Sequence, residues 1–303
     1  MWIKPEYLLV SGIIVFMLYR VSVIQEGFQD KRKVPVAPVP PASSVPPASS
    51  VPPAPSQKGP EVKVPDATNK QDDSNMTIEI VVANYEEKLD WINEIPEQFY
   101  TKLTIYNKGS AKNYKFPKMN SVNLPNIGHC DHTYLYHVVN NYGNLADITI
   151  FLPGSVWTQP YKKETANKMM SFIDIHKKAT LVCSDRPENH KNFFINEYEV
   201  QSPENSRFSS QQELTPAAIR PLGKWFEAHF PGEKHECVSF YGIVSASRES
   251  IHKRPKEFYQ GLLNEVSIPS PEAGHFTERT WANTFSIDKK DFINTARVTF
   301  FGF

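Results

Sequence analysis

Short apolar runs alternate with amphipathic stretches in the first half of the globular region, and this alternation predicts strands separated by helices. The strand candidates are residues 78–84 (IEIVVAN), 102–110 (KLTIYNKGS) and 147–152 (DITIFL). Between the first two, apolar residues recur at helical spacing until Pro96 ends the turn. This order predicts parallel strands joined by a right-handed crossover. The expected fold class is α/β, with an open, mostly parallel sheet flanked by helices in a single domain.

Polar residues stand at the carboxyl ends of these strands, where open α/β sheets bind their ligands. Asn84 and Tyr85 follow the first strand, and Asn107, Lys108 and Gly109 close the second. Glycine permits a positive φ and lets the backbone approach a ligand, although a plain turn explains the same residues. The pattern predicts a shared cleft at this edge of the sheet.

The third strand ends at Ser155, after a proline and a glycine, so that three strand ends point to the same cleft. Further along, residues 240–263 begin as a strand and continue with a helical pattern. Ser245 or Ser247 can cap this helix, and Arg248 adds a cation at the junction. These residues indicate a site but do not define a reaction.

Two glutamates near the C-terminus are candidates for a general base. Glu272 and Glu278 flank a short helical stretch, and Phe276 and Trp281 give it an aromatic environment. Apolar surroundings disfavour a charged carboxylate and raise its pKa, which suits a group that accepts a proton. The alternative is a surface ion pair between Glu278 and the neighbours of Arg279.

Residues 129–132 (HCDH), with His137 beyond them, concentrate side chains of the kinds that bind metals. His129 and His132 would share a helical face, yet apolar residues alternate with His137 along the same stretch, so some of these side chains must pack inward. A zinc site, inward packing and contact with an anion at a helix start all fit the cluster. We predict no metal site.

The N-terminal quarter of the chain differs from the rest. Residues 1–6 form a short flank, and residues 7–24 are predominantly apolar, near the lower limit for a membrane-spanning helix. No small-x-small cleavage site follows, which favours an uncleaved, single-pass anchor over a signal peptide. Residues 25–75 repeat a proline-rich unit and predict a disordered, extended stalk. The globular domain then covers residues 76–303.

The flanking charges leave the side of the membrane open. Arg20 and residues 31–33 (KRK) would place the domain in the cytoplasm by the positive-inside rule, but Arg20 can also snorkel. The glycosylation sequon at Asn75 is meaningful only on a lumenal side. The apolar N-terminus running into residues 26–28 (EGF) resembles anchors on proteins of large DNA viruses, which implies a viral membrane or a host endomembrane.

Charge and cysteine content exclude some classes of function. The chain has 33 basic and 33 acidic residues and a formal net charge of +0, so we expect no nucleic-acid partner. The three cysteines, Cys130, Cys183 and Cys237, are widely spaced and odd in number, a pattern of neither a disulfide framework nor a zinc ribbon. We expect each to be a small buried side chain. No Gly-x-Ser-x-Gly or His-Glu-x-x-His motif supports a hydrolase.

Six segments between residues 78 and 286 carry a family resemblance. They are VVANYEEKLDWINEIP, IYNKGS, LPNIG, HTYLYHVVNNYGNLADITIFLPG, SASRESIHKRPKEFYQGLL and EAGHFTERTW, in this order. With these segments the chain resembles the family catalogued as domain of unknown function 3431. That name implies no activity.

The order of the strand ends also resembles, more loosely, nucleotide-sugar glycosyltransferases of the GT-A type, a Rossmann-like fold. The resemblance implies a nucleotide-sugar donor contacted by Asn84, Tyr85, Asn107, Lys108, Gly109, Ser155 and Arg248. It implies an acceptor site at Trp157, Tyr241 and His275, with Glu278 as the base. Residues 153–155 (PGS) replace the acidic metal-binding motif of that type, which implies a metal-independent enzyme or an inactive copy.

Two functional hypotheses follow. The first is a membrane-anchored, glycosyltransferase-like protein that transfers a sugar from a nucleotide donor to a hydroxyl of a glycan or protein. The second is a catalytically inactive glycan-binding or structural module of a membrane or virion on the same scaffold. The missing acid at residues 153–155 favours the second hypothesis, whereas stabilisation by a nucleotide would favour the first.

Overall fold

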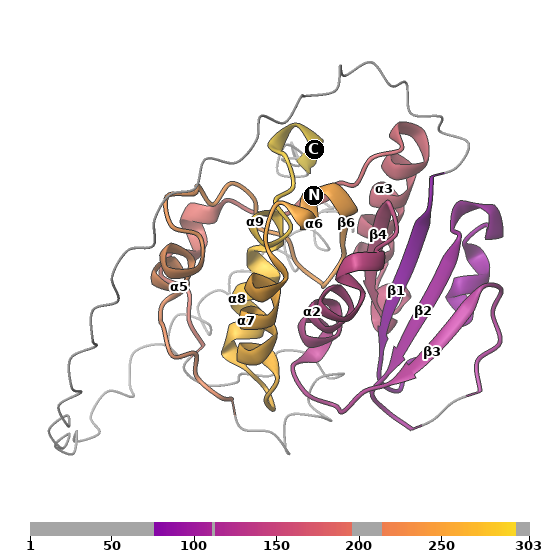
Figure 1. Ribbon diagram of the computed structural model, residues 1–303, viewed down its shortest axis with the longest axis horizontal. Coiled ribbons are helices and arrows are strands. Elements are labelled where there is room, and N and C mark those ends of the chain that lie inside the picture. The colour runs from indigo at the N-terminus through magenta and orange to yellow at the C-terminus, as the bar shows by residue number, and fades with distance from the viewer. Residues whose placement is uncertain (1–75, 111–112, 196–213, 295–303) are drawn as a thin grey trace, which may run out of the picture. The chain divides into compact units, whose positions relative to one another are not determined.

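The computed structural model describes residues 76–110, 113–195 and 214–294 of the chain (Figure 1). The chain separates into two units, residues 1–67 and 68–303, and all described residues belong to the second. The predicted anchor and stalk lie outside the described residues. Within the described ranges, no helix has both the length and the apolar character needed to cross a membrane.

Five strands form the central sheet in the order β3-β2-β1-β4-β6 (Figure 1). They are β1 (Ile78–Asn84), β2 (Lys102–Asn107), β3 (Met119–Asn123), β4 (Ile148–Pro153) and β6 (Val244–Ser247). The first four are parallel, and β6 runs antiparallel to β4. The predicted mostly parallel α/β sheet is thereby confirmed. The chain moves outward from β1 through β2 to β3 and returns to β4 on the other side of β1, which makes a topological switch point.

Alternate residues of the strands face two separate apolar cores, one on each side of the sheet. Val81, Tyr106 and Phe151 belong to the first core, and Ile80 and Leu152 belong to the second. Because both faces of the sheet are buried, the strands read as nearly continuous apolar runs in the sequence.

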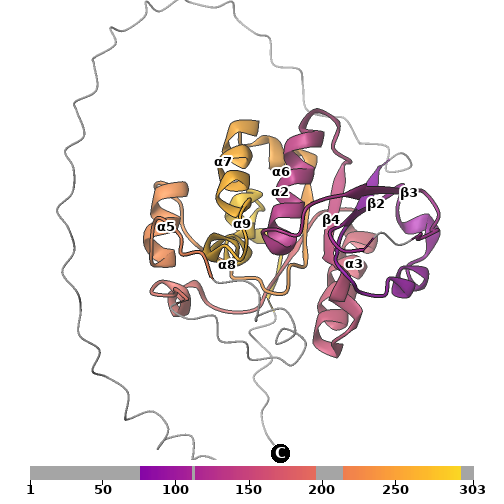
Figure 2. The same ribbon diagram turned by 90° about the horizontal axis from the view of Figure 1, so that it is seen from below.

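Helices cover both faces of the sheet (Figure 2). In chain order the α-helices are α2 (His129–Asn141), α3 (Pro160–His176), α5 (Leu222–His229), α6 (Arg248–His252), α7 (Lys256–Val266), α8 (Glu272–Arg279) and α9 (Trp281–Thr284). The shorter 3₁₀ helices are η2 (Asp90–Glu94), η3 (Glu97–Phe99), η4 (Tyr142–Asn144), η5 (Gly154–Trp157), η6 (Pro187–His190) and η7 (Lys289–Asp291). The first core packs against α2, α5, α7, α8 and α9, and the second packs against α3.

The connection between β1 and β2 differs from the predicted helix. It contains the two 3₁₀ turns η2 and η3, with Pro96 between them. The apolar residues at helical spacing are buried in the second core, Trp91 and Ile92 among them. The α-helix prediction was wrong because a short 3₁₀ turn buries the same residues and Pro96 prevents the turn from continuing as an α-helix.

A second, two-stranded parallel sheet is formed by β5 (Leu181–Cys183) and β7 (Phe292–Asn294). It is linked to the main sheet through Ser245 of β6, whose Oγ donates to the carbonyl of Thr180 at 2.7 Å. This small sheet carries Cys183, which ties it to the segment that precedes β6.

Candidate functional site

The carboxyl ends of β1 and β2 place two buried asparagines side by side. Asn84 and Asn107 are register partners and are 1% and 4% exposed. Asn84 Nδ2 donates to Tyr114 Oη at 3.1 Å, and Asn107 Nδ2 donates to the carbonyl of Gly109 at 3.2 Å. Neither Oδ1 atom accepts a hydrogen bond from the part of the chain that the structure describes. These two oxygens are therefore buried acceptors with unused hydrogen-bonding capacity at the carboxyl ends of the strands.

Gly109 is required by a close approach and not by its φ, which lies outside the left-handed region. A Cβ at this position would lie 2.0 Å from the carbonyl oxygen of Tyr85. The turn after β2 is thus packed directly on the turn after β1. The structure therefore brings Tyr85 and Gly109, both predicted site residues, together at this edge of the sheet.

The end of β4 completes this group of strand ends. A Cβ on Gly154 would lie 2.6 Å from Asn84 Oδ1, so glycine allows β4 and β1 to end in contact. The next residue, Ser155, accepts a hydrogen bond from Lys162 Nζ at 3.2 Å. Lys162 lies in the first turn of α3 and was not among the predicted site residues. Its position in the helix that follows the third strand end was the signal that could have identified it.

Lys108 extends toward the start of α2. Its Nζ donates to the carbonyl of Ile127 at 2.6 Å and to the carbonyl of His129. Burial lowers the pKa of Lys108 to about 8. Because two of its three donors hold the loop before α2, Lys108 braces this loop, and the structure does not show it beside the strand ends as a phosphate ligand.

Arg248 lies at the opposite edge of the sheet. Because β6 is antiparallel, Ser247 pairs with Ile148 at the beginning of β4, and Arg248 follows it. Its Nη2 forms an ion pair with Asp147 at 3.0 Å. Ser247 caps α6 as predicted, since its Oγ accepts from the N–H of Ser250 at 3.0 Å. The structure therefore separates Arg248 from the other predicted site residues.

Glu278 lies at the carboxyl edge. The start of β6 pairs with the end of β4, Val244 with Phe151, and the residues just before β6 hold the Glu278 carboxylate. Tyr241 N–H donates to Glu278 Oε1 at 2.8 Å, and Arg279 Nη1 lies 3.4 Å from Oε2. Burial raises the pKa of Glu278, whereas Arg279 opposes this rise. A raised pKa is a property that a general base requires, and the assignment of Glu278 as a base stays a prediction.

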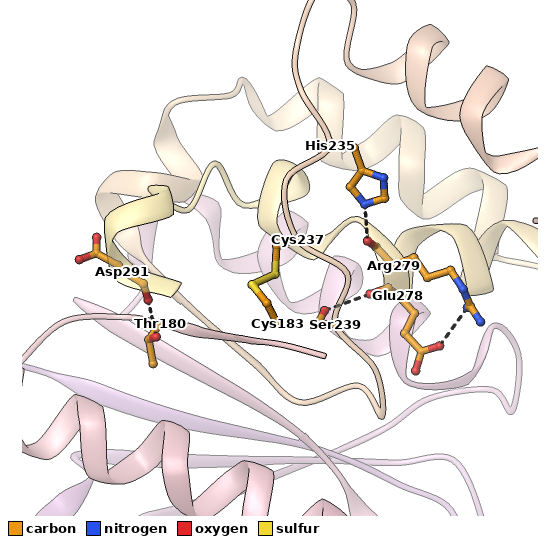
Figure 3. The surroundings of a disulfide bond; sticks show 8 residues. All are labelled: Thr180, Cys183, His235, Cys237, Ser239, Glu278, Arg279 and Asp291. Carbon is orange, nitrogen blue, oxygen red and sulfur yellow. Dashed lines mark hydrogen bonds and ion pairs between the residues drawn. A yellow bond between two sulfur atoms is a disulfide. The ribbon is translucent and has the colours of Figure 1, made fainter. Parts of the chain in front are cut away.

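The segment that holds Glu278 is anchored by a disulfide (Figure 3). Cys183 of β5 is bonded to Cys237, which lies 54 positions later in the sequence, with 5.3 Å between the Cα atoms. Beyond Cys237, Ser239 Oγ donates to the carbonyl of Glu278 at 3.2 Å. Both cysteines are buried, as expected, but the sequence pattern did not indicate their disulfide, because pairing depends on how the chain between them folds back. Cys130 is the free cysteine of the three.

Tyr241 lies beside the start of α3. Its φ of 73° is in the left-handed region, and its ring lies 4.9 Å from that of Tyr161, centroid to centroid. The two residues are 37% and 48% exposed. Lys162, next to Tyr161, is close enough to lower the pKa of Glu278. A carboxylate, an ammonium group and two exposed rings thus meet beside Ser155.

Two predicted acceptor residues have other surroundings. Trp157 stacks on Trp91 with 4.9 Å between ring centroids, and its Nε1 donates to Glu94 Oε2 at 3.0 Å. It packs on η2 in the second core. His275 lies on α8, 6.3 Å from the His129 ring, and burial lowers its pKa to about 3. His275 is therefore a neutral imidazole at the start of α2.

Glu272, the other candidate base, is fully buried and fully engaged. It accepts from the N–H groups of Ile195 and Ala217 at 2.6 and 2.9 Å. Arg220 Nε lies 2.8 Å from its Oε2. These contacts engage both oxygens and the side chain is inaccessible to a substrate, so Glu278, which is 21% exposed, is the better candidate.

The HCDH cluster contributes a second buried carboxyl to the same region. Asp131 is 5% exposed, and burial together with nearby Glu278 raises its pKa well above the ordinary range. Burial also lowers the pKa of His132 to about 4. Among the described side chains, no group of three or more His, Cys, Asp or Glu residues is placed to hold a metal ion.

These observations define a class of protein: a mostly parallel α/β domain with a desolvated carboxylate and polar side chains at the carboxyl edge of its sheet. The chain belongs to the family described as "Protein of unknown function (DUF3431)", whose model matches residues 80–299. The family resemblance is thereby confirmed. No curated protein matches the chain.

One similar solved structure is the crystal structure of S. aureus TarS 1-349, with a TM-score of 0.30 and 13% sequence identity. The match covers 67% of this chain and 54% of that one, so the chain spans about half the length of the matched structure. A similarity at this level supports no argument about activity.

Proposed function

We propose that the domain is a glycosyltransferase-like enzyme that transfers a sugar from a nucleotide donor to a hydroxyl of a glycan or protein, with Glu278 as the general base. The observation that carries this proposal is the Glu278 carboxylate. Its side chain is 21% exposed, its pKa is raised, and Tyr241 N–H holds it at the carboxyl edge of the sheet. A group of this kind can take a proton from a hydroxyl.

The chemistry that this arrangement supports is a single group transfer. Glu278 accepts the acceptor's hydroxyl proton while the oxygen forms a bond to the anomeric carbon of the sugar. The bond from that carbon to the diphosphate oxygen breaks, and the nucleoside diphosphate leaves with the electron pair. Asn84 and Asn107 support donor binding, because their buried Oδ1 atoms can accept hydrogen bonds from it.

The test uses the full chain with a panel of nucleotide sugars and measures release of nucleoside diphosphate. We expect Glu278→Gln to lower turnover by about 100-fold or more, since it cannot accept the proton. Glu257→Gln, on the exposed surface of α7, is the matched control and should retain the wild-type rate. Equal rates for wild type and Glu278→Gln would contradict the assignment of the base.

A non-catalytic glycan-binding or structural module is the second candidate. One observation favours it: Lys108 and Arg248, the two cations among the residues implied to contact the nucleotide donor, contact protein groups instead. This candidate predicts glycan binding by the wild type without release of nucleoside diphosphate from any donor. It also predicts that Glu278→Gln binds the same glycan with unchanged affinity.

We further propose that the domain is anchored through residues 7–24 and lies on the oxidising side of its membrane. The disulfide between Cys183 and Cys237 supports this location, because such bonds persist in oxidising compartments. In a secretory expression system, the full chain should carry an endoglycosidase-sensitive glycan that Asn75→Gln removes. An unglycosylated chain with reduced cysteines would contradict this location.

A further inference from the structure

Lys162 differs from its neighbours on α3 in the contacts of its ammonium group. Lys163 Nζ forms an ion pair with Glu94 at 2.7 Å, and Lys168 Nζ forms one with Glu164 at 2.6 Å. Within the described residues, the hydrogen-bond partner of Lys162 Nζ is the hydroxyl of Ser155 at 3.2 Å. A lysine ammonium has three donors and a full charge, so this neutral contact leaves most of its capacity unused.

The position of Lys162 in its helix is also unfavourable for a positive charge. The first turn of α3 contains no acidic residue, and its N-cap, Gln159, makes no side-chain capping bond. The positive end of the helix dipole disfavours a cation in this turn and favours an anion. The Glu278 carboxylate offsets part of the Lys162 charge, and a negatively charged group bound beside Lys162 would offset more of it.

The surroundings of Lys162 indicate what kind of anion fits. Ser155 follows Gly154, and a Cβ on Gly154 would lie 2.6 Å from Asn84 Oδ1, the buried acceptor described above. On the other side, Tyr161 and Tyr241 place two exposed rings in contact, and Tyr241 holds Glu278. A ligand that spans this region would carry negative charge, hydrogen-bond donors and a face for the rings. A nucleoside diphosphate has all three.

We propose that Lys162 and Ser155 form the phosphate-binding part of this site, where they hold the diphosphate of a nucleotide donor beside Glu278. The inference rests on the proposed function for its orientation, because Glu278 then acts on the acceptor while Lys162 stabilises the leaving diphosphate. In this proposal Lys162 is the cation that contacts the donor diphosphate, in place of Lys108 and Arg248, which the sequence resemblance implied as donor contacts. A preorganised cation at this point would favour the charge that develops as the diphosphate leaves.

The experiment measures binding without turnover, by calorimetric titration of the full chain with inorganic pyrophosphate and with UDP. We expect Lys162→Met to weaken both by about tenfold or more, because a charged contact is lost. Lys162→Arg should bind within about threefold of wild type, since the charge is kept. Lys168→Met, on the same helix, is the matched control and should bind as wild type does. Binding by the wild type should also weaken as salt is added.

The outcomes separate the two proposals. Binding of neither probe by the wild type, or equal binding by Lys162→Met and wild type, would overturn the phosphate site. A Lys162-dependent affinity together with unchanged turnover in Glu278→Gln would retain the phosphate site and reject the base. The melting temperature of each variant shows whether it folds. If Lys162→Met does not fold, a wild-type affinity for pyrophosphate that does not fall as salt is added would overturn the phosphate site.

Discussion

Glu272 and Glu278 stand at opposite ends of α8, and their carboxylates differ in exposure and in how closely their partners hold them. Glu272 lies in the first turn, is fully buried, and has two backbone donors and an arginine as partners. Glu278 lies in the last turn and is partly exposed; its Oε1 accepts from Tyr241 N–H at 2.8 Å, and its Oε2 has a longer contact of 3.4 Å with Arg279. The helix dipole stabilises an anion at the first end and disfavours it at the second.

The comparison shows what distinguishes a structural carboxylate from a reactive one. Sequence alone gave both glutamates the same aromatic neighbourhood, and the difference comes from the hydrogen-bond donors around each. A carboxylate whose oxygens are all engaged holds elements together. One that stays partly exposed while burial raises its pKa keeps the capacity to take up a proton.

The largest effect that would sharpen this comparison is expected at Glu272. Glu272→Ala leaves Arg220 and two backbone N–H groups without their acceptor, and breaking such a buried pair costs about 3–5 kcal/mol. Denaturant unfolding should show this loss. Glu257→Ala, at an exposed position, should change the free energy of unfolding by less than about 0.5 kcal/mol. An equally small effect at Glu272 would contradict its structural role.

The next effect concerns the disulfide that anchors the Glu278 side of α8. Replacing Cys183 and Cys237 by serine should lower the free energy of unfolding by about 2–5 kcal/mol. Hydrogen exchange should also become faster at the Tyr241 amide, while the amides of Ile195 and Ala217, held by Glu272, should change little. Equal acceleration at both sets of amides would show that the disulfide does not act selectively on Glu278.

A smaller effect is expected from Glu278→Gln, which should change stability by within about 1 kcal/mol. Its pH dependence gives the sharper test. The pKa of Glu278 is raised above 4.5 in the folded state, so the folded protein binds more protons and loses stability as pH rises from 4.5 through the folded value. Unfolding measured across this range should show that Glu278→Gln lacks this loss. A parallel pH dependence in both proteins would contradict the raised pKa.

The smallest effect is expected at a carboxylate outside α8. His229 Nε2 lies 2.6 Å from Glu265 Oε1, and this contact helps to raise the pKa of His229 against the effect of burial. The resulting stabilisation is present below pH 6.5 and is lost as pH rises through the folded pKa of His229. His229→Gln should cost about 1 kcal/mol or less at pH 6, because Glu265 is partly exposed. A larger loss above pH 8 than at pH 6 would contradict this sign.

The fold could be predicted because strands that are buried on both faces appear in the sequence as nearly continuous apolar runs. Apolar runs at residues 78–84 and 147–152 identify β1 and β4, and polar residues after them mark the carboxyl edge. The site was only partly predictable. Asn84 and Asn107 are register partners because the strands are parallel, and this direction follows from the alternating pattern.

The remaining site residues depend on contacts that spacing does not encode. Arg248 lies at the edge of the sheet opposite the other predicted site residues because β6 is antiparallel to β4. An apolar run in the sequence does not show in which direction its strand will run. Trp157 packs on Trp91, far from it in sequence. Cys183 and Cys237 pair across a long segment, and Lys162 is one lysine of several on α3 until its partners are known.

The central claim is that Glu278 is the carboxylate of α8 that can take up a proton. Its most direct test is a carboxyl-carbon NMR titration of the protein, with Glu278→Gln used to assign the signal. The account predicts a glutamate signal that titrates above pH 4.5 in the wild type and is missing from the variant. A Glu278 signal that titrates at or below 4.5 would contradict the claim.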